Sequence, residues 1–388
     1  LSLLRPLLLS GALLCGELHA GSSPSEPLLS TSWELYYARS ARLLQQDEAT
    51  LQAELQALRQ SDFSLPTLTR RFGFEPDLPA AFYQSAAGRE LLQAILSLQT
   101  PSGGWSKRTD MRIARQSGQH WGVEPNYVPT FDNSATTTQV RVLARAYNAT
   151  AEPLYRQAFT RGITLLLQAQ YPNGGFPQSY PLRGSYHDAI TLNDNTLYQL
   201  MQLLWQVAND QRFAMLADST KADAAAAFYR AVDWLLANQV VVNGKRTLWG
   251  AQHHPLSGAP VAARKFEQVA LVSSESGKLL QLLLHYASDY PGVAQSLAAG
   301  ASWLRQHQIK DKDRHRDAAG RLSLIDRPGS VIWARFYDIN SGQPVFFDRD
   351  GQIYTDVSQL SLERQRGYGW YQSVAGEFLA QYDKASQQ

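Results

Sequence analysis

The sequence contains almost no cysteine. Cys15 is the only one in 388 residues, so no disulfide can form within the chain. Neither a CxxC nor an HExxH motif occurs, and His253 and His254 are adjacent rather than one helical turn apart. Adjacent side chains point to different faces of a helix or strand. The common templates for a transition-metal site are therefore absent.

Motifs for nucleotide binding and for acyl transfer are also missing. The chain has no GxGxxG or GxxxxGKS loop to hold phosphates, and no GxSxG turn to present a serine nucleophile. Its single cysteine lies in the apolar segment at the N-terminus. The sequence thus argues against a nucleotide-dependent enzyme and against nucleophilic acyl chemistry.

Neither sign of charge dominates. The chain carries 36 basic and 34 acidic residues, which gives a net charge of +2. Nucleic-acid binding usually needs a strongly basic face, so we expect no nucleic-acid partner, but a local basic cluster for one acidic ligand remains open.

Hydrophobic residues make up 44%, enough for a large core. We expect a monomer, built either as one large unit with extensions or as two to three average domains.

No apolar run is long enough to span a membrane, which takes about 20 residues. Residues 1–20 carry one arginine, an apolar run and a terminal Ala20, and so resemble a secretory signal cleaved near Ala20. The alternative is an ordinary apolar N-terminal helix. We therefore predict a secreted or periplasmic protein without a membrane partner.

Helical periodicity dominates the rest of the chain. Apolar residues recur at helical spacing in segments 33–60, 88–99, 137–150, 154–170, 197–209, 224–239, 276–288 and 293–306. Strand-like stretches such as 330–339 and 343–355 are short, and helical periodicity fades from about residue 310 until 367–384. We predict an all-α fold with a helical extension at 21–75 and a main, catalytic domain at 76–388. Its part from about 310 would lay loops and strands over one face of the helices.

An internal repeat is visible in three helix endings. Each has a glutamine, then a turn with glycine, then an aromatic residue, which is Trp105, Phe176 or Trp249. The aromatic residues are 71 and 73 positions apart, which leaves room for two helices per repeat. Such a period predicts an array of helical hairpins, here an (α/α) toroid whose loops gather around a cleft at one end. The alternative is that glycine simply ends three unrelated helices. We expect these aromatic residues in the core.

Two Asp–Asn pairs stand out among the polar residues. Asp132–Asn133 and Asp194–Asn195 are 62 positions apart, each just before a predicted helix. Their side chains offer hard oxygen ligands of the kind that calcium binds. The alternative is helix capping, in which Asp or Asn accepts a free backbone N–H. Because each pair falls in a loop between helices of the repeat, we expect both at the same end of the array.

The second group of polar residues is basic. Arg264 and Lys265 follow a loop rich in proline and glycine, and Arg335 and Arg349 lie on two short apolar strands that form a hairpin around 340–344. A buried arginine must be paired or must face a ligand. Nearby aspartates allow structural ion pairs. Alternatively, three arginines beside a calcium ion suit a polyanionic ligand, since guanidinium groups match carboxylates.

Six ordered motifs, spread over about residues 85–371, together resemble the family 10 pectate lyases. They are "TPSGGWSKRTDM" (100–111), "TFDNSATTTQ" (130–139), "YPNGGFPQSYP" (171–181), "YHDAITLNDNT" (186–196), "AARKFE" (262–267) and "ARFYDINSGQPVFFDRDG" (334–351). The resemblance implies a helical toroid whose cleft binds polygalacturonate and cleaves it by β-elimination, with calcium and at alkaline pH.

The resemblance also implies roles for single residues. By motif, Asp194 is a calcium ligand, and Asp132 is the acid at the cleavage subsite, which we expect to bind metal once substrate is present. Asn133 lies beside it. Arg264 matches the base, and Arg335 and Arg349 match arginines that hold substrate carboxylates.

Four further residues follow from the same motifs. Lys107 and Asp110 are expected to support the cleft. Tyr186 and His187 either line the cleft or pack beside it. The family often has tyrosine after the basic residue of "AARKFE", and here Lys265 is a second cation that can face the cleft.

The chemistry suits these residue types. Elimination removes the proton on C5, and neutralising the adjacent carboxylate stabilises the charge that develops. Arginine is a poor base, with a pKa above about 12, unless calcium and neighbouring arginines lower it. Two alternatives remain: a glycoside hydrolase of a toroid class that uses Asp132 and Asp194 as its carboxylate pair, and a non-catalytic protein that binds acidic glycans.

Overall fold

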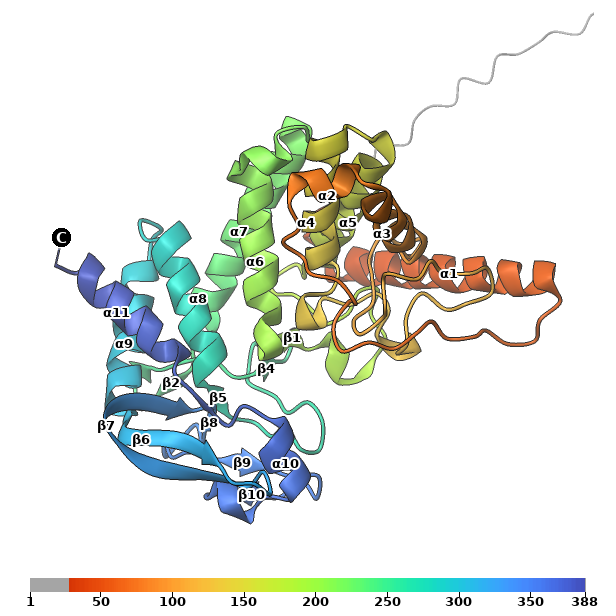
Figure 1. The fold of residues 1–388 in the computed structure, drawn as a ribbon. Coiled ribbons are helices and arrows are strands. Elements are labelled where there is room, and N and C mark those ends of the chain that lie inside the picture. Colours follow the sequence, from red (N-terminus) through yellow and green to blue (C-terminus); the bar gives the residue numbers. More distant parts are fainter. Residues whose placement is uncertain (1–27, 388) are drawn as a thin grey trace, which may run out of the picture.

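The structure is a computed structural model that describes residues 28–387, and it is dominated by helices (Figure 1). The helices are α1 (Trp33–Leu58), α2 (Ala80–Gln84), α3 (Ala86–Ser97), α4 (Thr137–Thr150), α5 (Pro153–Ala169), α6 (Thr196–Asn209), α7 (Asp218–Asn238), α8 (Ser273–Tyr286), α9 (Val293–Gln306), α10 (Leu362–Gly367) and α11 (Val374–Ala385). The helix-dominated fold is confirmed, and α4 and α9 begin and end at the predicted residues. The signal-like segment 1–20 lies outside the described residues.

Antiparallel hairpins of helices are the building unit. α4 pairs with α5, α6 with α7 and α8 with α9, and the hairpins follow one another across the molecule in chain order (Figure 1). α6 packs on both α4 and α8, and α5 packs on α7, so the helices form two layers. The residue types at the helix ends fit their positions. α5, for example, begins with Pro153, which lacks a backbone N–H, and in the first turn that N–H would have no partner within the helix.

The three glutamines of the internal repeat join successive hairpins. Each buried side-chain amide donates one hydrogen bond within its own turn and a second to a helix 57 to 59 residues further on. The pairs of acceptors are Gly103 and Ala158 for Gln99, Gly174 and Ala227 for Gln170, and Thr247 and Ser296 for Gln239. The repeat is therefore structural, because equivalent residues make equivalent bonds from α3 to α5, α5 to α7, and α7 to α9.

The aromatic residues that follow these glutamines lie in the core, as predicted. Trp105, Phe176 and Trp249 are fully buried. The indole N–H groups of Trp105 and Trp249 donate to carbonyls at the end of the preceding helix, at 2.8 and 2.9 Å. Burying an indole without a partner for its N–H would be unfavourable, so these bonds fix where each turn closes.

The N-terminal helix belongs to the same core. Tyr36 of α1 is buried among Tyr171 and Tyr180, and its hydroxyl donates to the carbonyl of Ala169 at 3.0 Å. Beyond α1, residues 59–79 are not helical, and they run along the loops that lie between α3 and α4. Residues 28–75 are thus packed against the helical array rather than set apart from it.

A small β region lies at one end of α8, α9 and α11 (Figure 1). Its main sheet has the order β11–β7–β6, and the other strands form two-stranded pairs, β1–β4, β2–β3, β5–β8 and β9–β10. The strands are β1 (Ile190–Thr191), β2 (Val241–Val242), β3 (Lys245–Arg246), β4 (Gln252–His253), β5 (Leu271–Val272), β6 (Ile309–Arg316), β7 (Leu322–Ala334), β8 (Phe336–Tyr337), β9 (Phe346–Phe347), β10 (Ile353–Tyr354) and β11 (Tyr371–Gln372). Within residues 28–387, no helix is long and apolar enough to cross a membrane.

The predicted hairpin around 340–344 is present. Tyr337 pairs with Pro344, and the backbone N–H of Asp338 donates to Gln343 at 2.9 Å. The carboxylate of Asp338 accepts from backbone N–H groups of the turn rather than from Arg335. Strand β6 was not predicted, because its sequence "IKDKDRHR" is charged on both faces.

Candidate active site

The two Asp–Asn pairs lie next to each other. They occupy the short 3₁₀ turns η2 (Asp132–Ser134) and η4 (Asn193–Asn195), which contact each other and precede α4 and α6. Asn133, Asp194 and Asn195 have φ of 52°, 52° and 61°. Asp and Asn tolerate this left-handed conformation better than most residues. The prediction that the pairs meet at the same end of the array is confirmed.

Neither aspartate caps a helix. The N-cap residues of α4 and α6 are Thr136 and Asn195, and neither helix has a side-chain cap. Instead, an oxygen of Asp132 accepts from the ammonium group of Lys107 at 2.6 Å. An oxygen of Asp194 accepts from Arg335 at 3.2 Å. The helix-cap alternative is therefore wrong for both carboxylates, which are held by cations.

Arg335 is positioned by backbone pairing at the junction of β7 and β8. Its N–H donates to the carbonyl of Trp370 at 2.7 Å, and its own carbonyl accepts from Ser273 at 2.9 Å. The buried guanidinium donates to Asn193 at 2.8 Å and also to Glu275. Burial opposes its charge, but Glu275, Tyr368 and Asp194 together outweigh this effect and raise the pKa of Arg335 above its usual value. Arg335 therefore stays charged.

The carboxyl group of Asp194 is electrostatically strained. Loss of hydration raises the pKa of Asp194, Arg335 opposes this shift, and the nearby carboxylate of Asp132 adds to it. Asp194 thus lies among charges of both signs, and a cation placed beside it would relieve the repulsion from Asp132.

Arg264 lies in the loop between β4 and β5 and is paired with Glu267. Its Nε and Nη2 donate to the two carboxylate oxygens at 2.8 and 2.5 Å, and its side chain is 44% exposed. The guanidinium also lies over the ring of Phe266, 4.8 Å from its centroid. The hydrogen bonds that Arg264 donates to Glu267 raise the pKa of Arg264 further above its usual value. In this arrangement the group predicted to be the base is held in its protonated form.

Three aromatic rings connect Lys107 and Arg264. The His187 ring lies tilted against Tyr186, with centroids 3.9 Å apart, and meets Tyr127 edge-on at 4.1 Å. The ammonium of Lys107 lies 4.5 Å from the ring of Tyr127. Burial, followed by the charges of Lys107 and Arg264, lowers the pKa of His187 to about 4. His187 is therefore neutral at neutral pH, and Tyr186 and His187 pack together beside both cations.

Arg349 lies close to Arg264. Its guanidinium is 4.0 Å from the centroid of the Phe266 ring, the same ring that Arg264 contacts, and it pairs with Glu363 at 2.8 Å. A third guanidinium, that of Arg364, lies 5.1 Å from this ring. The fold thus gathers two of the predicted substrate-handling arginines around one aromatic side chain.

Two predicted residues lie elsewhere. The side chain of Lys265 runs against Gly351, whereas Arg264 is the cation that approaches Tyr186, at 5.9 Å from its ring. Asp110 is buried and accepts three hydrogen bonds from Arg112 at 2.6 to 3.0 Å. Asp110 organises its own loop and is absent from the wall of the cavity described next.

A polar cavity of about 490 Å³ opens in front of the two Asp–Asn turns. Its walls come from four separate segments of the chain. The lining residues are Arg70, Arg71, Phe72, Phe74, Pro76, Lys107, Arg108, Asn133, Ser134, Thr138, Asp194 and Asn195. Its size is that of a small-molecule site, and its charged lining suits a polar ligand.

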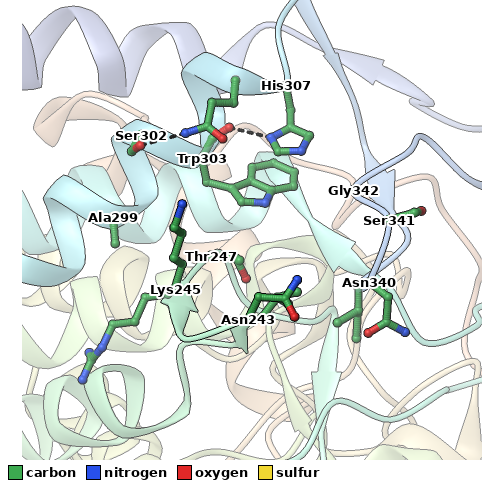
Figure 2. Close-up of a pocket in the computed structure, with 14 residues that line it drawn as sticks. Asn243, Lys245, Thr247, Ala299, Ser302, Trp303, His307, Asn340, Ser341 and Gly342 are labelled. Atoms are coloured by element: carbon green, nitrogen blue, oxygen red, sulfur yellow. Dashed lines mark hydrogen bonds between the residues drawn. The ribbon is translucent and has the colours of Figure 1, made fainter.

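Another cavity, of about 520 Å³, lies between the β2–β3 hairpin, α9 and residues 339–342 (Figure 2). Trp303 and His307 stack there with ring centroids 3.8 Å apart, and Lys245 projects toward the space (Figure 2). No carboxylate is among its lining residues. It therefore offers no carboxylate to act as an acid or to bind calcium, and we assign the chemistry to the cavity at the Asp–Asn turns.

Sequence reasoning missed three residues that hold this site together. Asn193 and Glu275 bind Arg335, and Glu267 binds Arg264. Glu267 is the last residue of the motif "AARKFE", so its closeness to Arg264 in the sequence could have identified it as a partner. Asn193 directly precedes the second Asp–Asn pair. Glu275 had no signal, because it meets Arg335 across 60 residues of sequence.

The residues present fit part of a calcium shell. Among residues 28–387, no group of three or more His, Cys, Asp or Glu is arranged to hold a metal ion. One oxygen of Asp132 is nevertheless buried and has no hydrogen-bond partner there, and Asp194 supplies a second carboxylate on the neighbouring turn. Calcium takes about six to eight oxygen ligands. A bound calcium ion would therefore need further oxygens from a ligand or from water.

Known proteins share the family signature and the fold of this chain. A family model described as pectic acid lyase matches residues 99–379. A solved structure of a family 10 polysaccharide lyase from Cellvibrio cellulosa is 31% identical, with a TM-score of 0.71, and the match covers 79% of this chain and 94% of that one. A mutant of such a lyase from the same organism, in complex with trigalacturonic acid, is 29% identical with a TM-score of 0.70, and the match covers 79% and 98%. No curated protein sequence matches this chain significantly.

Proposed function

The chain belongs to the pectic acid lyase family, as a family 10 polysaccharide lyase, and we propose that it cleaves polygalacturonate by β-elimination. The similar structure that holds trigalacturonic acid supports an acidic galacturonate chain as the substrate. The reaction would leave a double bond between C4 and C5 of the new non-reducing end.

One observation carries the proposal. Two cations and two acids, Lys107 with Asp132 and Arg335 with Asp194, converge from four separate segments on adjacent turns. A neutral sugar gains nothing from such cations at the point of cleavage, whereas a galacturonate carboxylate does. This arrangement therefore favours elimination next to a carboxylate over hydrolysis of a neutral glycan.

The protein's own groups divide the work as follows. Arg335 and Arg349 bind substrate carboxylates and so stabilise the negative charge that develops when the C5 proton leaves. Arg264, in its neutral form, takes that proton. The electron pair of the C5–H bond forms the C4–C5 double bond, and the C4–oxygen bond breaks toward the departing chain. Tyr186 and His187 pack beside Arg264 and restrict its movement.

Calcium is part of the proposal. Asp194 would hold it, joined by Asp132 once substrate is bound, and the ion would supply positive charge beside the C6 carboxylate. Asn133 lies on the same cavity wall and can offer its amide oxygen. Before calcium binds, the ammonium group of Lys107 neutralises the charge of the Asp132 carboxylate.

The finer structural and cellular assignments are proposals as well. The two layers of hairpins, with the Asp–Asn turns at one end, support an (α/α) toroid. The composition of residues 1–20 supports export, and we propose a monomer that acts outside the cytoplasm on pectate.

An absorbance assay tests the activity. The protein is incubated with polygalacturonate, and the ultraviolet absorbance of the 4,5-unsaturated product is followed with and without a chelator. We expect the absorbance to rise, the chelator to stop the rise, and Arg264→Ala to abolish it, with Arg264→Lys tested alongside. Arg305→Ala is the matched control, since Arg305 is also 44% exposed and ion-paired, but far from the cavity.

The other outcomes identify other functions. New reducing ends without absorbance would mean hydrolysis, with Asp132 and Asp194 as the carboxylate pair. Binding of polygalacturonate without any product would mean a non-catalytic glycan-binding protein. A chelator without effect would refute the calcium assignment but leave the lyase activity intact.

A further inference from the structure

A second pair of arginines reaches the cavity from the N-terminal part of the chain. Arg70 and Arg71 line the same cavity as Asn133 and Asp194. Both are exposed, and neither side chain has an ion pair or hydrogen bond to any other residue in the range 28–387. They also precede residue 99, where the match to the pectic acid lyase model begins.

The backbone on both sides of this pair is anchored. The N–H of Thr69 donates to the carbonyl of Arg108 at 2.8 Å, and the carbonyl of Phe72 accepts from Met111 at 2.9 Å. The Phe72 side chain is buried in the main core. The two arginines therefore sit between two fixed points, along the loop that follows Lys107.

The chain then makes a turn that fits only glycine. Gly73 has φ of +79°, and a Cβ placed on it would lie 2.3 Å from an oxygen of Asp110. Just beyond, Arg145 binds the carboxylate of Asp77 and the carbonyl of Pro76. Asp110 is thus a support for this segment, and the path of residues 69–77 past the cavity is fixed by packing rather than free.

The charges at the cavity show what this pair can do. Lys107 is neutralised by Asp132 and Arg108 by Glu124, at 2.6 and 3.1 Å. Arg70 and Arg71 are the cations of the cavity wall that lack an acidic partner within the described part of the chain. Two adjacent guanidinium groups without protein acids form a site for carboxylates from outside.

We propose that Arg70 and Arg71 bind the carboxylates of galacturonate units that lie beyond the cleavage point, and so extend the substrate cleft across the cavity. The inference rests on the proposed function. Polygalacturonate carries one carboxylate on every sugar, so a chain that occupies the Asp–Asn turns and continues along the cavity brings further carboxylates to Arg70 and Arg71. A trimer that does not extend beyond the cleavage point would leave these two arginines without a carboxylate.

The test is the double variant Arg70→Ala/Arg71→Ala, assayed by absorbance on polygalacturonate and on trigalacturonate. We expect KM for the polymer to rise about threefold to tenfold, since each exposed ion pair contributes a few-fold at most. kcat should stay unchanged, and KM for the trimer should change less than twofold by the same reasoning. Arg70→Lys/Arg71→Lys, which keeps both charges, should recover part of the affinity for the polymer.

The control is Arg89→Ala/Arg156→Ala, which removes the same charge from exposed helical positions outside this cavity. The inference is overturned if KM for the polymer is unchanged in the Arg70/Arg71 variant, if the control raises it equally, or if polymer and trimer are affected alike. If the wild-type protein gives no unsaturated product, the proposed function fails instead. Calorimetric affinities of the same variants for polygalacturonate then decide the inference separately.

Discussion

The ion pair between Arg264 and Glu267 gives a sharp test of the proposed base. Within residues 28–387, the carboxylate of Glu267 accepts hydrogen bonds from Arg264 and from no other predicted site residue, and both of its oxygens hold the guanidinium. The substitution Glu267→Gln keeps the shape of the side chain and removes its charge. We expect it to make Arg264 easier to deprotonate.

The size of the effect follows from the geometry. Both bonds are short, but Arg264 is 44% exposed while Glu267 is 10% exposed, so solvent screens part of the interaction. A buried charge-assisted hydrogen bond contributes about 1.5–3 kcal/mol and an exposed ion pair about 0.2–1 kcal/mol. This half-exposed pair falls between them, at about 1.4 kcal/mol, which corresponds to about one pKa unit.

The assay is the dependence of kcat on pH, followed through the absorbance of the unsaturated product. Because a neutral Arg264 is the active form, activity should rise with pH, and a lower pKa should move that rise to lower pH. For Glu267→Gln we expect a shift of about one pH unit, and so about a tenfold higher kcat at a fixed pH below the rise.

A matched control is available in the same group of side chains. Arg349 likewise donates two hydrogen bonds to a glutamate, Glu363, and lies on the same Phe266 ring as Arg264. Glu363→Gln should change KM, because Arg349 binds substrate, and should leave the pH profile of kcat in place. If Glu267→Gln stays active without a shift, or if both variants shift equally, Arg264 is not the base that Glu267 controls.

Three further predictions concern calcium, pH-dependent stability and the repeat. Asp194→Asn should raise the calcium concentration for half-maximal activity about tenfold or more, because ligand charge sets calcium affinity. A calcium titration of activity measures this concentration, and an unchanged value would show that Asp194 is not a calcium ligand. Burial raises the pKa of Asp47 from 3.8 to about 6 against hydrogen bonds from Ser102, so the folded state binds this proton more tightly and the free energy of unfolding should fall as pH rises from about 4 to 6. Asp47→Asn should flatten this dependence in urea unfolding at several pH values, and an unaltered slope would contradict it. Gln170→Leu removes the amide donor shared by the carbonyls of Gly174 and Ala227 and should destabilise the fold by about 2–4 kcal/mol, whereas Gln93→Leu on an exposed face should change stability by less than about 0.5 kcal/mol.

The sequence predicted the parts of the fold that depend on local periodicity. Helices such as α4 and α9 follow from apolar spacing, and the three glutamine turns follow from the repeat. Strand β6 could not be predicted, because a charged ribbon paired mainly with β7 has no apolar alternation to reveal it. The closure of the hairpins into a toroid stays a prediction.

The site was predictable only where the repeat or a motif fixed the geometry. The meeting of Asp132 and Asp194 follows from their equivalent places in successive hairpins. The contact of Arg335 with Glu275 joins residues 60 positions apart, one in a helix and one at the junction of two strands, whose packing is set by the whole fold. The position of Arg70 and Arg71 in the cavity wall could not be predicted for the same reason. Residues 64–72 reach the cavity by pairing with loops at 108–120, which are distant in the sequence.

The ion pairs of the site change how it must work. The cations predicted to bind substrate are already neutralised by the protein: Arg335 by Glu275 and Asp194, Arg264 by Glu267, and Arg349 by Glu363. A polyanionic substrate therefore competes with protein carboxylates for the same guanidinium groups. A divalent cation that binds Asp194 would weaken the hold of that carboxylate on Arg335 and so leave part of the guanidinium free for the substrate, while Glu275 still holds the rest. The need for calcium would then arise from this internal competition as much as from polarisation of the substrate.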